Sequence, residues 1–346
     1  MNNINYKKVH NKFKLNGFHL NADDLCRVAY SFIKEGAEFE KPVGNFILDW
    51  FDTNDTITMQ TSGSTGKPKT IHVKKEAMIY SALATGDFFN LEPGYTILNC
   101  LPVKYVAGKM MFIRAFILGL EMDFVAPSSH PMELLEKTYD FTALVPLQAQ
   151  NSLDKLSFFK TIIIGGASVS SDLEKKLKAI PSAIYETYGM TETITHIAAR
   201  KVGAKAFTTL PNVVLSQDEN NCLLIHAPHI SEDIIHTNDI VALVSENKFQ
   251  FLGRFDNIIN SGGIKLIPEQ IEAKMQSYIK NRFFVTGKED QELGEHLVLV
   301  IEGEPIEIDL SKIKNLDKYE KPKEIIFVNK FKETPNGKVI REESWV

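Results

Sequence analysis

A run rich in hydroxyl, glycine and lysine side chains occupies residues 60–70 of the 346-residue chain and reads QTSGSTGKPKT. It directly follows the apolar segment TITMQ. Glycines let backbone N–H groups approach an oxyanion, while hydroxyls add donors and lysines add charge. The run therefore predicts a loop that cradles a polyphosphate rather than a flexible surface loop. The residues expected to bind the phosphates are Thr61, Ser62, Gly63, Ser64, Thr65, Gly66, Lys67 and Lys69.

This loop is not a Walker A motif. That motif places two glycines five residues apart and follows the second with lysine and then serine or threonine. Here the residue five positions before Gly66 is Thr61, and Pro68 follows Lys67. The sequence thus predicts a nucleotide loop of a different kind.

The segments around the loop alternate between short apolar runs and helix-like stretches. Strand candidates such as TILNC, FTALVP, KTIIIGG and AIYETYG alternate with predicted helices over residues 75–89, 106–119, 132–139 and 170–180. An amphipathic helix precedes them, with Asn21 as its N-cap and Gly36 as its stop. This alternation predicts an α/β fold with a mainly parallel sheet, in which binding loops gather at the carboxyl ends of the strands.

The pattern changes after about Pro211. The short strand candidates CLLIHA, DIVALV and KFQFLG predict an antiparallel appendage. Beyond Arg254 the chain combines a strand and turn, a helix that begins at Pro268, and further strands. We therefore expect a large N-terminal domain over residues 1–253 and a small α+β C-terminal domain over residues 254–346.

Composition excludes several classes of protein. Lys and Arg number 39 against 44 Asp and Glu, so the net charge of −5 argues against general attraction to nucleic acid or anionic lipid. The most apolar stretch, residues 110–126, is interrupted by charges before it reaches a membrane-spanning length, so no membrane insertion is expected. Three widely spaced cysteines fit a cytoplasmic location. The sequence leaves open whether the chain forms a homo-oligomer.

Six blocks in one order along the chain resemble the signature motifs of the adenylate-forming superfamily of acyl- and aryl-CoA ligases. They are the loop at 61–70, GGA at 165–167, YGMTE at 188–192, HTND at 236–239, GRFDNIINSGGIKLIPEQIE at 253–272 and TPNGKVIR at 334–341. The resemblance implies an ATP-dependent ligase that forms an acyl-AMP intermediate and then an acyl-CoA. Mg²⁺ would be its cofactor, and ATP and coenzyme A its co-substrates.

The resemblance also implies an adenosine site. Tyr188 would offer an aromatic face to adenine, and Asp239 would accept the ribose hydroxyls. Thr191 and Glu192 would act as catalytic residues that hold Mg²⁺, which prefers oxygen ligands and shares them with phosphate. The remaining residues of this site would be Gly165, Gly166, Ala167, Gly189, Met190 and Arg254.

Lys338 is the expected catalytic residue of the terminal block. Attack of a carboxylate on the α-phosphate brings two anions together, and a positioned ammonium can neutralise them. The family alternates between its two half-reactions by swinging the small domain, a mobile lid, about a hinge that corresponds to Asp256. The turn at Ser261, Gly262 and Gly263 would then face the site where the thiol of coenzyme A displaces AMP.

The acid pocket is expected along residues 101–116, with Arg114 binding a carboxylate that is not activated. An arginine at this place, the SGG-x-x-I-x-P-E wording and the compact chain are most similar to o-succinylbenzoate-CoA ligases of menaquinone biosynthesis. The alternative for Arg114 is a surface position on a helix. Further candidates for the acid pocket are Lys104, Tyr105, Lys109 and His196.

The chain departs from the family pattern at several positions. Tyr105 stands where the family has histidine, Thr70 replaces the glycine after the loop lysine, and Asn238 replaces the glycine before Asp239. Only 60 residues precede the loop, so the first subdomain is expected to be mostly absent. Two alternative functions stay open: a stand-alone adenylation domain that loads a carrier protein, and a nucleotide-binding pseudoenzyme without turnover.

Overall fold

The computed structural model describes residues 5–60, 70–333 and 339–345, and the chain divides into two compact units. Unit 1 comprises residues 1–214 and 226–235, and unit 2 comprises residues 215–225 and 236–346. The sequence predicts a boundary between residues 253 and 254, after which the chain moves as a lid. A division into compact units does not test such a movement, so this boundary stays a prediction. In the part of the chain that the structure describes, no helix could cross a lipid bilayer.

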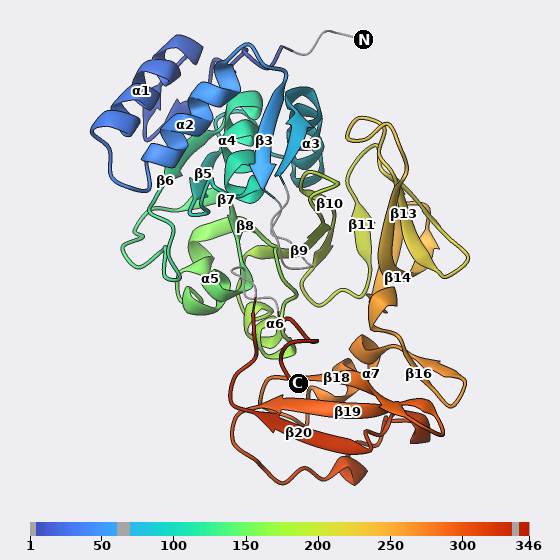
Figure 1. The fold of residues 1–346 in the computed structure, drawn as a ribbon. Coiled ribbons are helices and arrows are strands. Elements are labelled where there is room, and N and C mark those ends of the chain that lie inside the picture. The colour runs from blue at the N-terminus through green and yellow to red at the C-terminus, as the bar shows by residue number, and fades with distance from the viewer. Residues whose placement is uncertain (1–4, 61–69, 334–338, 346) are drawn as a thin grey trace. The chain divides into compact units, whose positions relative to one another are not determined.

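Unit 1 is built on a sheet whose central strands are parallel (Figure 1). Its strands lie in the order β2-β1-β6-β5-β7-β8-β9-β10-β11. The pairings of β1 with β2, β9 with β10, and β10 with β11 are antiparallel. The predicted α/β fold with mainly parallel strands is confirmed. The bounds are β1 (Lys14–Leu15), β2 (Phe18–His19), β5 (Thr96–Asn99), β6 (Glu121–Phe124), β7 (Tyr139–Leu144), β8 (Phe159–Ile164), β9 (Ala183–Gly189), β10 (His196–Lys201) and β11 (Phe207–Thr209).

The helices of unit 1 include three of those that the sequence predicts between residues 75 and 180. The helix α3 ends at Asn90, whose left-handed backbone (φ 51°) closes it, and α4 ends at Gly119 (φ 74°). The N-cap of α1 is Asn21, as expected. The bounds are α1 (Ala22–Lys34), α2 (Lys41–Phe51), α3 (Lys75–Phe89), α4 (Val106–Leu118), α5 (Pro146–Asn151), the short 3-10 helix η1 (Leu156–Phe158) and α6 (Ser171–Leu177).

The helix α2 is not among the predicted elements. It packs beside α1 because Gly44 leaves no side chain between them: a Cβ atom there would lie 2.5 Å from the carbonyl oxygen of Ala29. On the side toward α4, the ring of Phe46 contacts that of Phe112 edge-on, with centroids 6.1 Å apart. The helix α2 thus covers α4, and Figure 1 shows α1 and α2 side by side at one edge of unit 1.

An ion pair between a buried lysine and a partly exposed aspartate fixes the start of α3. Lys75 is fully buried, and its Nζ lies 2.7 Å from Oδ1 of Asp52 and 4.6 Å from the ring centroid of Tyr6. Burial opposes ionisation of Asp52, but hydrogen bonds from Lys75 and Asn54 lower its pKa overall. The strand that precedes α3 is therefore held in place at its end.

The predicted helix over residues 132–139 is wrong. Residues 131–134 form turns instead, and Tyr139 already belongs to β7. Met132 is buried and Leu135 packs against the same cluster, while Leu134 between them is 94% exposed. Turns thus bury the apolar side chains of this segment without a helix. Tyr139 stacks on Phe159 of the neighbouring strand β8, with centroids 5.7 Å apart, and this contact stabilises the strand.

Unit 2 begins with the antiparallel appendage that the sequence predicts. The strands lie in the order β12-β13-β14-β15, and β14 pairs antiparallel with β15 so that Asp239 lies directly opposite Arg254. The bounds are β12 (Val214–Gln217), β13 (Cys222–His226), β14 (Ile235–Ser245) and β15 (Lys248–Arg254).

The rest of unit 2 has the predicted α+β composition. A small sheet has the order β17-β16-β19-β18, with β20 pairing parallel to β19. Buried residues of β18, β19 and α7 form its core, among them Met275, Val285 and Leu299. The bounds are η2 (Phe255–Asn257), β16 (Ile259–Ser261), β17 (Ile264–Leu266), α7 (Pro268–Met275), β18 (Phe283–Asp290), β19 (Gly294–Glu302), η3 (Leu310–Lys312), η4 (Lys318–Glu320) and β20 (Glu324–Val328).

Candidate active site

Two of the predicted site segments lie outside the described residues. They are the phosphate loop at 61–69 and residues 334–338, which include Lys338. The strands that flank the loop, β3 (Thr56–Gln60) and β4 (Thr70–Lys74), pair antiparallel with Gln60 opposite Thr70. The two ends of the loop therefore meet at one end of a hairpin.

The turn at Gly165, Gly166 and Ala167 follows the carboxyl end of β8, where a parallel sheet presents its binding loops. A Cβ atom on Gly165 would lie 2.5 Å from the hydroxyl oxygen of Thr187 on β9, so a larger residue would require the Thr187 side chain to move. Gly166 has a left-handed backbone with φ 87°. The close approach sets this turn against the strand that carries Tyr188.

Aromatic and charged neighbours position Tyr188. Its ring lies 5.9 Å from that of Phe207 on β11, and the guanidinium of Arg200 lies 4.6 Å from the Phe207 ring centroid. Arg200 in turn donates to Oε2 of Glu186, 2.9 Å from its Nε. The other carboxylate oxygen of Glu186 accepts from the backbone N–H of Val169 at 3.3 Å. Glu186 thus ties the strand of Tyr188 to the segment that follows the glycine turn.

The turn between β9 and β10 holds Thr191 and Glu192. Fully buried Thr193 organises it: its hydroxyl accepts from the N–H of Met190 at 2.9 Å and donates to the carbonyl of Thr195 at 2.7 Å. Glu192 is exposed and Thr191 is half-buried. The hydroxyl and the carboxylate are therefore both open to a ligand from solvent.

The turn also requires glycine at position 189. A Cβ atom on Gly189 would lie 2.3 Å from the carbonyl oxygen of Thr195, because β10 folds back directly onto β9. The sequence motifs did not single out Thr193, although it organises this turn. Its lack of exposure could not be read from the sequence.

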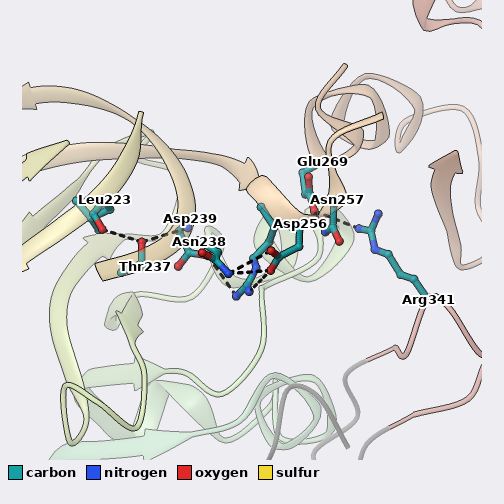
Figure 2. Close-up of polar contacts among 9 residues, drawn as sticks. Leu223, Thr237, Asn238, Asp239, Asp256, Asn257, Glu269 and Arg341 are labelled. Carbon is teal, nitrogen blue, oxygen red and sulfur yellow. Dashed lines mark hydrogen bonds and ion pairs between the residues drawn. The ribbon is translucent and has the colours of Figure 1, made fainter. Parts of the chain in front are cut away.

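Asp239 and Arg254 form an ion pair within unit 2. Figure 2 shows Asp239 beside Thr237 and Asn238. Asp239 is 6% exposed, and its backbone N–H donates to the hydroxyl of Thr237 at 3.1 Å. The Thr237 hydroxyl donates to the carbonyl of Leu223 at 2.9 Å. Nη1 of Arg254 lies 3.4 Å from Oδ1 of Asp239. The carboxylate predicted to bind ribose is thus fixed from two sides.

Asp256, the predicted hinge, is the second carboxylate that Arg254 contacts, at 2.9 Å from Nη2. The amide Nδ2 of Asn238 donates to both carboxylate oxygens of Asp256, at 3.1 and 3.2 Å (Figure 2). Asn238 is a position where this chain departs from the family glycine. Asparagine in place of glycine at position 238 therefore adds a contact to the predicted hinge residue Asp256.

Replacing Asn238 by glycine tests this contact. We expect the rate of acyl-CoA formation relative to acyl-AMP formation to change about two- to fivefold, because two hydrogen bonds to an exposed carboxylate contribute about 1 kcal/mol at most. The two rates are measured separately by rapid quench. Asn220→Gly, in an exposed turn, serves as the control. An unchanged ratio in Asn238→Gly would show that the contact does not restrain the hinge.

Ser261 and its two following glycines form the tip of the β16–β17 hairpin. Ser261 pairs with Ile264, so Gly262 and Gly263 are a two-residue turn. Both have left-handed backbones, with φ 58° and 81°, as such a turn requires. A Cβ atom on Gly263 would meet no atom within 4 Å. Its surroundings in unit 2 therefore leave space beside this backbone.

Arg341 anchors the chain three residues beyond Lys338. Its Nη1 donates to the carbonyl of Val285 at 3.0 Å, and its Nη2 donates to Oε2 of Glu272 at 3.0 Å. Nη2 also lies 3.6 Å from Glu269 (Figure 2). Burial raises the pKa of Glu272, although Arg341 opposes that shift. The last block is thus fixed to the core of unit 2 on its C-terminal side.

Arg114 is a buried cation in unit 1. Its side chain is 2% exposed, and burial lowers its pKa to about 9. Within the described residues, Nε and Nη2 have no hydrogen-bond partner, and Nη1 reaches only the sulfur of Met111 at 3.8 Å. The alternative of a surface arginine is therefore wrong. A buried guanidinium without a carboxylate partner is costly and suits an anionic ligand.

His196 neighbours Arg114. Burial and then the charge of Arg114 lower the pKa of His196 well below its usual value, so the imidazole is neutral near pH 7. Its Nε2 lies 3.4 Å from the hydroxyl of Thr85, and its Nδ1 lies 3.5 Å from that of Thr195. His196 also lines a pocket of about 210 Å³. Two of the predicted acid-binding residues are thus brought together.

The other predicted acid-binding residues lie in the first turn of α4 or just before it. Nζ of Lys109 lies 4.9 Å from the ring centroid of Phe46 on α2, and burial lowers its pKa while Asp49 opposes the shift. Tyr105 is the N-cap residue of α4, and Nζ of Lys104 lies 5.9 Å from its ring centroid. Lys109 therefore faces α2, where the carboxylate of Asp49 partly offsets its charge.

Comparison with known proteins identifies the family. The AMP-binding enzyme family matches residues 21–215, more than half of the chain. The chain belongs to the AMP-binding enzyme family. Its matched region contains the hairpin of β3 and β4, the glycine turn and the turn with Thr191 and Glu192.

Several relatives have a named function. The 2-succinylbenzoate–CoA ligase of Listeria monocytogenes is 27% identical over 91% of this chain and 74% of its own length. That of Escherichia coli K12 is 25% identical over 78% of this chain and 63% of its own length. An acyl-CoA synthetase (AMP-forming)/AMP-acid ligase II-like protein of Dyadobacter fermentans is 31% identical, with a TM-score of 0.63. That match covers 92% of this chain and 97% of the other.

The fold is also that of a solved family member with bound nucleotide. The o-succinylbenzoate coenzyme A synthetase of Bacillus subtilis, in complex with ATP and a magnesium ion, superposes with a TM-score of 0.71. It is 19% identical and is covered over 69% of its chain, against 83% of this one. At this identity the likeness shows the fold alone.

The residues present fit a magnesium ion shared with phosphate. The Thr191 hydroxyl and Glu192 carboxylate are hard oxygen donors that remain accessible. Among the described residues, no group of three or more His, Cys, Asp or Glu could hold a metal by itself. An ion at Thr191 and Glu192 would therefore need further oxygen ligands from a nucleotide.

Proposed function

We propose that this protein is an ATP-dependent acid-CoA ligase that converts o-succinylbenzoate to o-succinylbenzoyl-CoA with release of AMP and pyrophosphate. Membership of the AMP-binding enzyme family supports the chemistry. The 2-succinylbenzoate–CoA ligases among its relatives support the choice of acid. The observation that carries the proposal is Arg114, a buried guanidinium with two unpartnered nitrogens beside His196.

The chemistry of Arg114 selects among acids. A fatty acid has one carboxylate, which must reach the α-phosphate, and its apolar tail would leave Arg114 buried without a partner. O-succinylbenzoate has two carboxylates, so one can pair with Arg114 while the other is activated. A charge-assisted hydrogen bond of this kind contributes about 1.5–3 kcal/mol. The unpaired cation thus favours a dicarboxylate over a monocarboxylate.

In the first half-reaction, a carboxylate oxygen of the acid attacks the α-phosphorus of ATP, and the bond to pyrophosphate breaks. Lys338 would neutralise the charge that gathers between the two anions. Mg²⁺, when held by Thr191 and Glu192, supplies positive charge to the polyphosphate. Tyr188 and Asp239 would orient the adenosine. Coenzyme A then attacks the acyl carbon through its thiolate, and AMP leaves.

Release of pyrophosphate in a panel of acids tests the proposal. The panel comprises o-succinylbenzoate, benzoate, succinate and octanoate, each with ATP, Mg²⁺ and coenzyme A. We expect release with o-succinylbenzoate at least tenfold faster than with either monocarboxylate, because those acids leave Arg114 unpaired. Release with only another acid of the panel would mean that the enzyme activates that acid instead of o-succinylbenzoate. No release with any acid would favour a pseudoenzyme.

A carrier-protein adenylation domain is the nearest alternative. Such a protein forms the acyl-AMP but does not pass the acyl group to free coenzyme A. Mass spectrometry of the product with free coenzyme A distinguishes the two. The same experiment tests the assignment of coenzyme A as acceptor, for which the open turn at Gly263 is the structural support.

The location of the reaction is part of the proposal. The cysteines Cys26, Cys100 and Cys222 are all free thiols, and two of them are buried. Free thiols persist in a reducing compartment, where ATP and coenzyme A are also available. We therefore place the reaction in the cytoplasm.

A further inference from the structure

An isolated antiparallel bridge joins Glu333 to Val339, on either side of residues 334–338. The residues between them include the predicted catalytic lysine and lie outside the described residues. We call residues 331–333 the incoming stem and residues 339–341 the outgoing stem. Contacts that hold the two stems therefore hold both ends of the segment that carries this lysine.

Ser344 ties the two stems together. It is 6% exposed, and its hydroxyl accepts from the N–H of Lys332 at 3.0 Å and donates to the carbonyl of Ile340 at 2.6 Å. The N–H of Ile340 donates in turn to the carbonyl of Lys332 at 2.8 Å. Bonds between the stems alone would let them move as a pair. The contacts of each stem with the rest of unit 2 therefore decide where the stems lie.

Two phenylalanines and two arginines connect the stems to the small sheet. The rings of Phe331, on the incoming stem, and Phe284, on β18, have centroids 5.1 Å apart, and both side chains are buried. The guanidinium of Arg282 lies 5.6 Å from the ring centroid of Phe331, and that of Arg341 lies 5.6 Å from the ring centroid of Phe284. A cation is attracted to an aromatic ring at such distances. Arg341 belongs to the outgoing stem, and Arg282 contacts the incoming one.

Arg282 also contacts the incoming stem through two carboxylates. Its Nη2 donates to Oε1 of Glu333, and its Nη1 donates to Oε2 of Glu302 at 3.3 Å. The other carboxylate oxygen of Glu302 accepts from the backbone N–H of Phe331 at 2.8 Å. The main chain of Arg282 is itself fixed, because its carbonyl accepts from the N–H of Glu302 at 2.8 Å. One guanidinium thus holds both ends of the incoming stem.

Arg282 contributes little to the core of unit 2. Its side chain is 49% exposed, and exposed ion pairs add little to the stability of a fold. Its side-chain partners are nevertheless all on the incoming stem or bonded to it: Phe331, Glu333 and Glu302. The contacts of this arginine therefore fix the place of the stem more than they stabilise the unit.

We propose that Arg282 is a positioning residue for Lys338. It holds the incoming stem, as Arg341 holds the outgoing stem. The inference rests on the proposed function, in which the lysine acts in acyl-AMP formation and not in transfer to coenzyme A. A displacement of about 1 Å at a reacting group can lower a rate about 100-fold. Release of one stem should therefore slow the first half-reaction and spare the second.

Arg282→Gln removes the charge and keeps a polar side chain. With o-succinylbenzoate we expect acyl-AMP formation to slow about tenfold, which corresponds to about 1.4 kcal/mol. Transfer of the acyl group from preformed acyl-AMP to coenzyme A should change less than about twofold. Single-turnover assays measure the two half-reactions. Arg282→Lys restores the charge without the planar fork, so acyl-AMP formation should return to within about threefold of its original rate.

A double variant tests whether Arg282 acts through the lysine. Residues that act as a unit give losses that do not add. Combining Arg282→Gln with Lys338→Ala should therefore slow acyl-AMP formation by less than about twofold beyond Lys338→Ala alone. Lys274→Gln is the matched control, because it breaks a partly buried ion pair with Glu320 and touches neither stem. It should leave both half-reactions near their original rates.

Amide hydrogen exchange tests the anchor without turnover. Mass spectrometry follows exchange in peptides that cover the two stems of the ligand-free protein. In Arg282→Gln we expect the incoming stem to exchange about tenfold faster, because its local opening costs less free energy. Lys274→Gln should leave exchange in the stem unchanged. If Arg282→Gln fails to fold, Glu333→Gln removes the partner on the stem and replaces it in both experiments.

Several outcomes would overturn the proposal. Unchanged acyl-AMP formation in Arg282→Gln, equal loss of both half-reactions, or a further tenfold loss in the double variant contradicts the positioning role. Unchanged exchange in the incoming stem contradicts the anchor. If the unaltered protein releases no pyrophosphate with any acid, the proposed function fails and this inference fails with it. If the unaltered protein and Arg282→Gln release pyrophosphate equally fast, only this inference fails.

Discussion

Replacing Lys338 by alanine is expected to slow acyl-AMP formation by about two orders of magnitude or more. The ammonium group acts where the carboxylate and the α-phosphate approach each other, and no other positive side chain belongs to that block before Arg341. Transfer of the acyl group from preformed acyl-AMP to coenzyme A should be largely retained. Single-turnover assays of each half-reaction measure the two effects.

The control for this variant is Lys330→Ala, which removes an exposed lysine from the same part of the chain. It should leave both half-reactions near their original rates. Equal loss of both half-reactions in Lys338→Ala would mean that the lysine has been assigned the wrong role. A loss confined to the second half-reaction would contradict the assignment in the same way.

Arg114→Met is expected to stabilise the protein while it weakens acid binding. Exchange of a buried charge for an apolar side chain of similar volume often stabilises a fold by about 1–4 kcal/mol. Loss of the charge-assisted hydrogen bonds should lower affinity for the dicarboxylic acid about 10- to 100-fold. Urea denaturation and acid titration measure the two effects. A destabilised variant with normal acid affinity would show that Arg114 is structural.

Arg200→Met provides the matched comparison for stability. Arg200 is partly buried but pairs with Glu186, so its loss leaves a buried carboxylate without its partner. The same substitution should therefore destabilise the protein there. Opposite signs at the two arginines would separate a ligand-binding cation from a structural one.

The pH dependence of acid binding gives an independent check on Arg114. Burial lowers the pKa of this guanidinium to about 9, and only its charged form attracts a carboxylate. Acid affinity should therefore decline as the pH rises through about 9 in the unaltered protein. In Arg114→Met the decline should be absent.

Much of the fold was predictable because local and tertiary preferences agree. The helix over residues 75–89 matches its predicted bounds, and Asn90 closes it with a left-handed backbone. At residues 132–139 the local pattern and the tertiary structure disagree, because Tyr139 pairs with Phe159 of β8 and so forms part of strand β7. For α2, Gly44 resembles a helix breaker until the close passage of α1 is known. Such close packing between two helices depends on tertiary structure and cannot be predicted from a local sequence pattern.

The candidate site was predictable as a set of motifs but not as a set of contacts. Sequence pattern located Arg114 and His196, yet it could not tell that the guanidinium lacks a partner. The hydrogen bond from Asn238 on β14 to Asp256 in η2 joins two residues that become neighbours only after folding.

The N-terminal helices decide how far the chain can be shortened. Phe46 and Phe51 of α2 cover the rings of Phe112 and Phe116 on α4, the helix that carries Arg114. A trimmed protein that starts after α2 would expose those rings as an apolar patch, which promotes aggregation. The acid site that we propose at Arg114 would lose the support of α4 at the same time. Expression and crystallisation trials should therefore retain the segment before the phosphate loop.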